Sequence, residues 1–143
     1  MKKIYLIFGS KSDLEYFTPI EGPLKKAKIN YELKILSAHR NTDELLKYVK
    51  SKKEGVFICA AGYSALLPSL SAAVTDLPVI GVPISSSPVK VDALWSIVQM
   101  PKGTPVACMS FDKAGLINGF IFALKIFEEY DKVKLLKKEL KIF

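Results

Sequence analysis

The sequence predicts an α/β fold, a three-layer α/β/α sandwich around a parallel sheet of about five strands. Short apolar runs alternate with helical patterns along the whole chain. The run over residues 55–60 is apolar throughout, as in a strand covered on both faces. The chain has 143 residues, 50% of them hydrophobic and 24% charged, which suits one domain with a buried core. We therefore expect a single domain over residues 1–143.

Five apolar runs are the expected strands. Each ends in a turn or loop, and they cover residues 3–8, 31–37, 55–60, 79–83 and 105–110. Helical patterns start after residue 13 and near residues 42, 65, 93 and 114, and the tail over residues 133–140 is amphipathic. This alternation is typical of a flavodoxin-like sheet with helices on both faces.

Two helices carry particular sequence signals. Pro19 and Pro23, with a glycine between them, predict that the first helix bends or divides before residue 28. The second helix can be capped by Asn41 or Thr42, and Glu44 is suitably placed for a capping box.

The composition also bears on where the protein works. No apolar run approaches the roughly 18 residues of a membrane span, and the apolar start is too short for a signal peptide. We therefore expect a cytoplasmic protein. Cys59 and Cys108 lie in separate apolar runs without metal-ligand spacing, so we expect both to be buried as small hydrophobic residues.

The chain carries a formal net charge of +7, but its basic residues do not indicate a nucleic-acid surface. They are scattered, and no aromatic residues alternate with them as a base-stacking platform requires. Of 21 basic residues all are lysine except Arg40, and its neighbour His39 is the only histidine. The single guanidinium is therefore a candidate for a position that an ammonium would not serve.

Three loops are expected at one edge of the sheet, because ligands of such folds bind beyond the carboxyl ends of the strands. They cover residues 9–13, 37–40 and 61–64. The only histidine and the only arginine both fall on this edge. The edge is therefore the predicted binding site.

The first of these loops has the chemistry of a phosphate and sugar clamp. Gly9 lets the backbone approach a ligand, Ser10 and Ser12 supply hydroxyls, and the following helix offers free N–H groups. Asp13 can accept hydrogen bonds from ribose. An alternative remains open at this point, in which Ser12 or Asp13 only caps the helix.

His39 can exchange protons near neutral pH, since the ordinary pKa of histidine is about 6.5. The alternative is a histidine satisfied within its loop or by partly buried packing. A metal site is not expected, because one histidine and two isolated cysteines make no ligand set.

Four stretches, in this order, closely resemble the N5-carboxyaminoimidazole ribonucleotide mutase family, the catalytic subunit of phosphoribosylaminoimidazole carboxylase in purine biosynthesis. They are Gly9-Ser10-Lys11-Ser12-Asp13, Ser37-Ala38-His39-Arg40, Leu77-Pro78-Val79-Ile80-Gly81-Val82-Pro83 and Ser96-Ile97-Val98-Gln99-Met100-Pro101-Lys102-Gly103. The resemblance covers nearly the whole chain and weakens after about Tyr130.

The resemblance implies an octamer with active sites near subunit boundaries, and we expect the helix over residues 131–143 to pack on a neighbouring subunit. It implies an isomerase that moves a carboxylate from the exocyclic nitrogen of an imidazole ribonucleotide to ring carbon 4. The reaction is expected to pass through carbon dioxide and aminoimidazole ribonucleotide in a closed pocket, without ATP, metal or another cofactor.

The matching positions also imply roles for individual residues. Ser10, Ser12 and Arg40 should hold the phosphate, and Asp13 the ribose. His39 should move the proton between nitrogen and carbon. Other expected substrate-binding residues shape the carboxylate site or the carbon dioxide pocket: Gly9, Ser37, Ala38, Ala61, Gly62, Tyr63, Ser64 and Leu66.

The third loop departs from the family's usual Ala-His-Leu-Pro-Gly, because Leu66 replaces a second histidine. Ser64 resembles the related aminoimidazole ribonucleotide carboxylases, which bind carbon dioxide directly. Those carboxylases typically carry lysine after the motif histidine and an Arg-Met-Pro-Ser type of stretch, so Arg40 and residues 99–103 favour the mutase. Two other departures, Asn41-Thr42 for Thr-Pro and Lys90 for a loop glycine, bear on loop closure and rate.

Three functions therefore remain open from the sequence. The leading one is the mutase, and the second is a direct carboxylase, a lyase. The third is a non-catalytic nucleotide-binding protein that kept the fold. A phosphorelay receiver is disfavoured, because the first strand ends in Gly9-Ser10 rather than an acidic pair, and a flavodoxin is disfavoured because no threonine-rich phosphate cradle follows.

Overall fold

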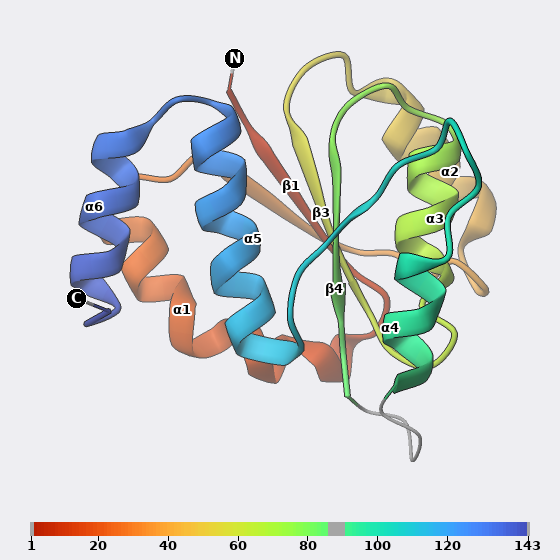
Figure 1. Ribbon diagram of the computed structural model, residues 1–143, viewed down its shortest axis with the longest axis horizontal. Coiled ribbons are helices and arrows are strands. Elements are labelled where there is room, and N and C mark those ends of the chain that lie inside the picture. Colours follow the sequence, from red (N-terminus) through yellow and green to blue (C-terminus); the bar gives the residue numbers. More distant parts are fainter. Residues whose placement is uncertain (1, 86–90, 143) are drawn as a thin grey trace.

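The computed structural model describes residues 2–85 and 91–142. Its centre is a five-stranded parallel sheet with the strand order β2-β1-β3-β4-β5. The strands are β1 (Ile4–Phe8), β2 (Tyr31–Ile35), β3 (Val56–Ala61), β4 (Val79–Pro83) and β5 (Ala107–Cys108). The parallel sheet with helices on both faces confirms the predicted three-layer, flavodoxin-like fold (Figure 1).

Helices cover both faces of this sheet. They are η1 (Lys11–Asp13), α1 (Leu14–Lys26), α2 (Thr42–Ser51), α3 (Leu66–Ala73), α4 (Val91–Val98), α5 (Asp112–Ile126) and α6 (Tyr130–Glu139). Figure 1 shows α1, α5 and α6 on one side of the sheet and α2, α3 and α4 on the other. This arrangement explains why β1, β3 and β4 are buried along their whole length.

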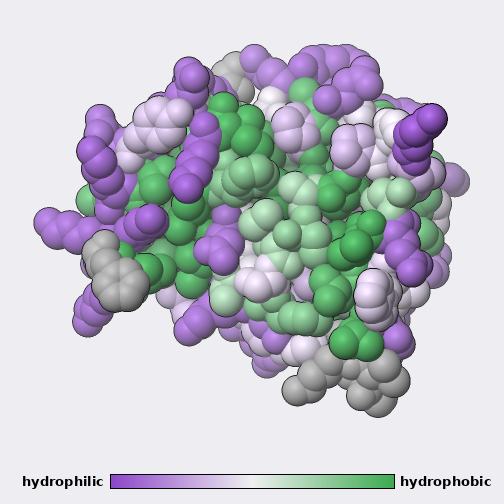
Figure 2. All heavy atoms as spheres, in the orientation of Figure 1, coloured by the Kyte–Doolittle hydropathy of each residue, from purple (hydrophilic) through white to green (hydrophobic). Residues whose placement is uncertain are grey.

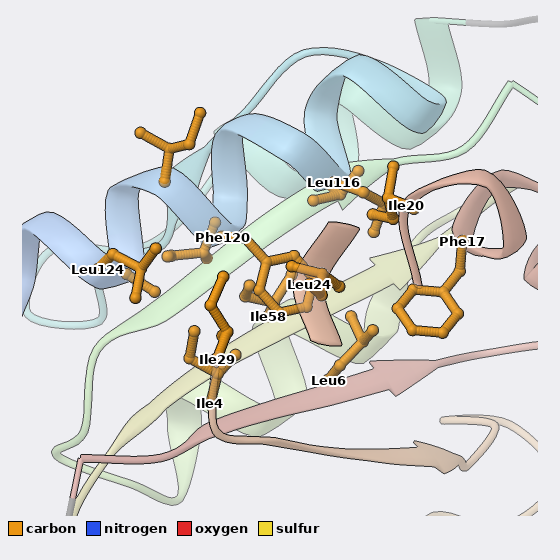
Figure 3. Close-up of a cluster of buried hydrophobic side chains, with 14 of the residues drawn as sticks. Ile4, Leu6, Phe17, Ile20, Leu24, Ile29, Ile58, Leu116, Phe120 and Leu124 are labelled. Atoms are coloured by element: carbon orange, nitrogen blue, oxygen red, sulfur yellow. The ribbon is translucent and has the colours of Figure 1, made fainter. Parts of the chain in front are cut away.

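Two hydrophobic cores lie between these layers. One core joins the sheet to α1, α5 and α6, where Leu6, Ile58 and Phe120 meet Ile20 and Leu24 (Figure 3). The other joins the opposite face to α2, α3 and α4. Each fully buried side chain of this size contributes roughly 1.5–3 kcal/mol to the free energy of unfolding. The sheet is thereby held rigidly enough to position loops at its edge.

The sequence predicted that the first helix bends or divides, and division is wrong. Residues 14–26 form one continuous helix although Pro19 and Pro23 lie inside it. Its buried side chains are Phe17, Ile20 and Leu24, which share one face and pack into the core. Burial of this face outweighs the loss of two backbone hydrogen bonds.

The fifth strand is shorter than the predicted run over residues 105–110. Only Ala107 and Cys108 pair with β4, opposite Ile80 and Gly81. The strand lies at the sheet edge and follows a proline, which has no N–H to donate. Cys108 is consequently only half-buried, whereas Cys59 in β3 is fully buried as expected.

Helix α6 packs on its own chain. Val133 and Leu136 are buried in the core shared with α1 and α5. Packing of residues 131–143 on a neighbouring subunit stays a prediction, and it would use the outer face of this helix. Lys90, where the family has a loop glycine, lies outside the described residues.

The strands are parallel, so their carboxyl ends lie at the same edge of the sheet. Helices α1, α4 and α5 begin along the lower side of the molecule in Figure 1. Parallel pairing places Phe8, Ile35 and Ala60 side by side at this edge. In the part of the chain that the structure describes, no helix is long and apolar enough to cross a membrane.

Candidate active site

A cavity of about 440 Å³ opens at this edge. It is formed by the loops after β1, β2 and β3 together with the start of α3. Its lining is Gly9, Ser10, Ser12, Asp13, Ser37, Ala38, His39, Arg40, Ala61, Gly62, Tyr63, Ala65, Leu66 and Leu67. Every site residue expected from the sequence lines it except Ser64.

The first loop presents two hydroxyls to the cavity. The backbone of Ser10 is extended, and its Oγ lies 2.9 Å from the Oγ of Ser12. Gly9 donates its N–H to Ala60 at 3.1 Å, and a methyl group at Gly9 would touch the Ala61 Cβ at 3.5 Å. A side chain at Gly9 would therefore not clash with the rest of the protein. The absence of a side chain instead leaves room for a ligand.

Asp13 is a buried carboxyl on the cavity wall. It occupies the N-cap position of α1, yet neither it nor Ser12 makes a side-chain capping hydrogen bond. The capping alternative is therefore wrong for both residues. Burial raises the pKa of Asp13 to about 6, and the negative charges of Glu15 and Asp112 add to this increase.

The second loop is a turn held by its own hydrogen bonds. Ser37 Oγ accepts the N–H of Arg40 at 3.2 Å, and Ser37 O accepts the N–H of Asn41 at 2.9 Å. The side chain of Asn41 points back to the N–H of Ser37 and makes no cap bond to α2, while Thr42 donates to the carbonyl of Ala38. The predicted cap is absent because both side chains instead stabilise the turn.

This turn presents His39 and Arg40 with their side chains exposed. Neither side chain makes a hydrogen bond or ion pair with another residue in the two described ranges. The alternative of a histidine satisfied within its loop is therefore wrong. The imidazole and the guanidinium are available to a ligand.

The third loop carries backbone strain. Tyr63 and Ala65 have φ angles of 51° and 41°, in the left-handed region that ordinary residues adopt at a cost of roughly 1–2 kcal/mol. The N–H of Ala65 is bonded to the carbonyl of Gly62 at 2.9 Å, which closes the turn before α3. Leu66 then reaches the cavity, whereas Ser64 does not line it.

Sequence reasoning missed Ala65 and Leu67 on the cavity wall. Both are buried and apolar, so they carry no chemical signal, and only the geometry of the turn before α3 places them.

The cavity as a whole offers hydroxyls, a cation, an imidazole and a buried carboxyl. This set suits a phosphorylated sugar that carries a heterocycle. Within residues 2–85 and 91–142, no three His, Cys, Asp or Glu side chains lie close enough to hold a metal ion.

The fold and this cavity define a parallel α/β protein with a polar cavity at the carboxyl edge of its sheet. Residues 3–141 match the family model described as AIR carboxylase, and the chain belongs to this family. The resemblance stated from the sequence motifs is thereby confirmed.

Curated relatives carry a more particular name. The N5-carboxyaminoimidazole ribonucleotide mutase of Thermotoga maritima is 40% identical over 99% of this chain and 86% of that protein. The enzyme of the same name from Bacillus subtilis is 42% identical over 89% of this chain and 81% of its own length. The crystal structure of Treponema denticola PurE is similar with a TM-score of 0.76 and 26% identity, covering 99% of this chain and 88% of that one.

Proposed function

We propose that this protein is an N5-carboxyaminoimidazole ribonucleotide mutase, an isomerase of purine biosynthesis. It moves a carboxylate from the exocyclic nitrogen of the imidazole to ring carbon 4 and gives 4-carboxy-5-aminoimidazole ribonucleotide. The observation that carries the proposal is the imidazole of His39, which has no partner among residues 2–85 and 91–142 and lies on the wall of a cavity that also presents Arg40 and Asp13. The names of the curated relatives support the same activity.

In this proposal the phosphate of the nucleotide binds between the first two loops. Ser10 and Ser12 donate hydroxyl hydrogen bonds, and Arg40 forms a bidentate ion pair. Asp13 accepts hydrogen bonds from the ribose hydroxyls as a carboxylate. The heterocycle then points toward His39 and the third loop.

His39 moves one proton during the reaction. The bond between the exocyclic nitrogen and the carboxylate breaks, its electron pair stays on nitrogen, and His39 supplies the proton that restores the amine. Ring carbon 4 then attacks the released carbon dioxide and forms the new carbon–carbon bond. The proton of carbon 4 returns to His39, so the imidazole ends in the state in which it began.

The carbon dioxide must stay beside the ring between these steps. The backbone around Ala61, Gly62 and Tyr63 and the turn at Ser37 and Ala38 form the wall that retains it, with Leu66 as an apolar cover. An apolar lining suits this use, because carbon dioxide is uncharged and water would compete for it. The reaction belongs in the cytoplasm in this account.

The proposal includes assembly into an octamer. Val91, Trp95 and Val98 lie on one face of α4 and are about half exposed. Helix α4 contacts α3, whose first residue, Leu66, is also exposed. Figure 2 shows hydrophobic atoms gathered over this part of the surface. Exposed apolar side chains gathered on one helix face are typical of an interface between subunits, and a second copy of this chain is the proposed partner.

A direct carboxylase is the second candidate function. The observation in its favour is Leu66, which lines the cavity where the mutase family has a second histidine. Ser64, the other residue that suggested a carboxylase, does not line the cavity. We therefore keep the mutase as the proposed function.

The variant His39→Asn tests the role of the imidazole. It should abolish turnover of the carboxyamino nucleotide while much of the nucleotide affinity remains, because the amide keeps the side chain's polarity but cannot exchange a proton at neutral pH. Turnover is followed by ultraviolet absorbance and affinity by calorimetry. Turnover within twofold of the wild type would overturn the role of His39. Nucleotide binding without turnover in the wild type would instead support a non-catalytic protein.

A further inference from the structure

Asp112 at the start of α5 has a backbone conformation that is uncommon for residues other than glycine, although aspartate tolerates it better than most. Its φ angle is 57°, in the left-handed region that favours glycine, and it lies outside the candidate active site. Its carboxylate accepts two hydrogen bonds from Ser85, one from the backbone N–H at 2.8 Å and one from the side-chain hydroxyl. A strained backbone is thus retained together with a bidentate contact.

The contact fixes the end of β4 against α5. The first turn of α5 also lies close to this strand, because an added Cβ at Gly115 would lie 2.8 Å from Val82 and 1.8 Å from the carbonyl oxygen of Ser110. Ser85 follows β4 by two residues, and the intervening Ile84 donates its N–H to the carbonyl of Ala61 at 3.0 Å. Ala61 lines the cavity.

A second set of contacts joins the same residues to the first loop. The pKa of Tyr16 in α1 is raised by burial, and the negative charges of Asp112 and Glu15 add to this increase. Among the described residues, Glu15 from α1 and Asp112 from α5 are the charged groups that act on Asp13, and both raise its pKa. The start of α1, the start of α5 and the end of β4 are therefore close enough for Asp112 to act on both Tyr16 and Asp13 while it holds Ser85.

We propose that Asp112 is a positioning residue for the reaction: its carboxylate holds Ser85, and through Ile84 and Ala61 it keeps the wall of the carbon dioxide pocket in place. This inference rests on the proposed function. A wall that loosens should let carbon dioxide escape before ring carbon 4 attacks it. The enzyme would then release aminoimidazole ribonucleotide instead of the carboxylated product.

The variant Asp112→Gly tests this proposal, because glycine adopts the same φ angle without strain but removes both hydrogen bonds to Ser85. Amide exchange of Ile84 and Ser85 should become about tenfold faster. The ratio of released aminoimidazole ribonucleotide to carboxylated product should rise severalfold, after subtraction of the loss measured without enzyme. Asp112→Asn keeps one oxygen for the N–H of Ser85 and should give a smaller increase.

Asp131→Asn is the matched control, since Asp131 is also the acidic residue in the first turn of a helix but lies at the start of α6. It should behave as the wild type in both measurements. An unchanged product ratio in Asp112→Gly would overturn the positioning role, whether or not amide exchange changes. A wild-type protein that forms no carboxylated product would overturn the proposed function and this inference together.

Discussion

At Arg40, the contribution of positive charge to phosphate binding can be separated from the contribution of hydrogen-bond geometry. It is exposed at the cavity and has no partner among the described residues. Arg40→Lys should weaken binding of aminoimidazole ribonucleotide about tenfold, because a planar fork that makes two parallel hydrogen bonds becomes a point charge. Calorimetry at fixed ionic strength measures this affinity. Lys102→Arg, at an exposed position away from the cavity, should leave it unchanged, and an unchanged affinity in Arg40→Lys would contradict the phosphate role.

Asp13 should make the stability of the unliganded protein depend on pH. Its pKa is about 6 in the folded protein and 3.8 in the unfolded chain, so folding takes up a proton between these values. Stability therefore decreases as the pH rises through this window, by about 2–3 kcal/mol in total. Asp13→Asn should remove this decrease and stabilise the protein at pH 7, although it weakens nucleotide binding.

Urea unfolding at pH 5 and pH 7 measures the effect of Asp13. The wild type should be less stable at pH 7 than at pH 5. This difference in the free energy of unfolding should disappear in Asp13→Asn. Asp43→Asn, at an exposed position in the first turn of α2, should keep the wild-type difference. Equal pH dependence in Asp13→Asn and the wild type would show that the Asp13 carboxyl is not the group that titrates.

Residues with distinctive chemistry could be predicted at the cavity from the sequence, because a parallel sheet brings the ends of its strands to one edge. His39, Arg40 and Asp13 were found in this way. Whether these side chains are free or hydrogen-bonded depends on which other side chains lie close to them in space, and the sequence does not show this. The same limit applies to Ala65, whose left-handed backbone follows from the turn and not from its residue type.

At the scale of elements, two helical glycines should respond in opposite directions to the same substitution. Gly115→Ala in α5 places a Cβ 1.8 Å from the carbonyl oxygen of Ser110 and should destabilise the protein by about 3 kcal/mol. Gly22→Ala in α1 meets nothing within 4 Å and should stabilise it by about 0.8–1 kcal/mol through helix propensity. Thermal or urea unfolding measures both. A destabilised Gly22→Ala would contradict the continuous helix over residues 14–26.

The elements also show where local signals fail. The strands over residues 4–8 and 79–83 were predicted within one residue, because their burial makes them apolar throughout. Pro19 and Pro23 predicted that α1 bends or divides, and it does not divide. The preference of proline is local, whereas the burial of Phe17 and Leu24 depends on the whole fold. Pairing of β5 is likewise set by its position at the edge of the sheet.

At the scale of the whole molecule, the apolar face of α4 should form a contact between subunits. Trp95→Glu places a charge in the middle of this face and should lower the assembled mass seen by sedimentation velocity. Burying an unpaired carboxylate in an apolar contact costs several kcal/mol. Ile126 is also an exposed hydrophobic residue, but it lies in α5 on the other side of the sheet. Ile126→Glu is therefore the matched control. An unchanged mass in Trp95→Glu would show that α4 is not at the interface.

We propose that the cavity with His39 at its wall performs the mutase reaction. A paired spectrophotometric assay on one preparation tests it, with the carboxyamino nucleotide in one arm and aminoimidazole ribonucleotide with low bicarbonate in the other. The account predicts faster formation of the carboxylated product from the carboxyamino nucleotide, so that Leu66 is a tolerated substitution. A preference for aminoimidazole ribonucleotide and bicarbonate would contradict it and make this protein a direct carboxylase.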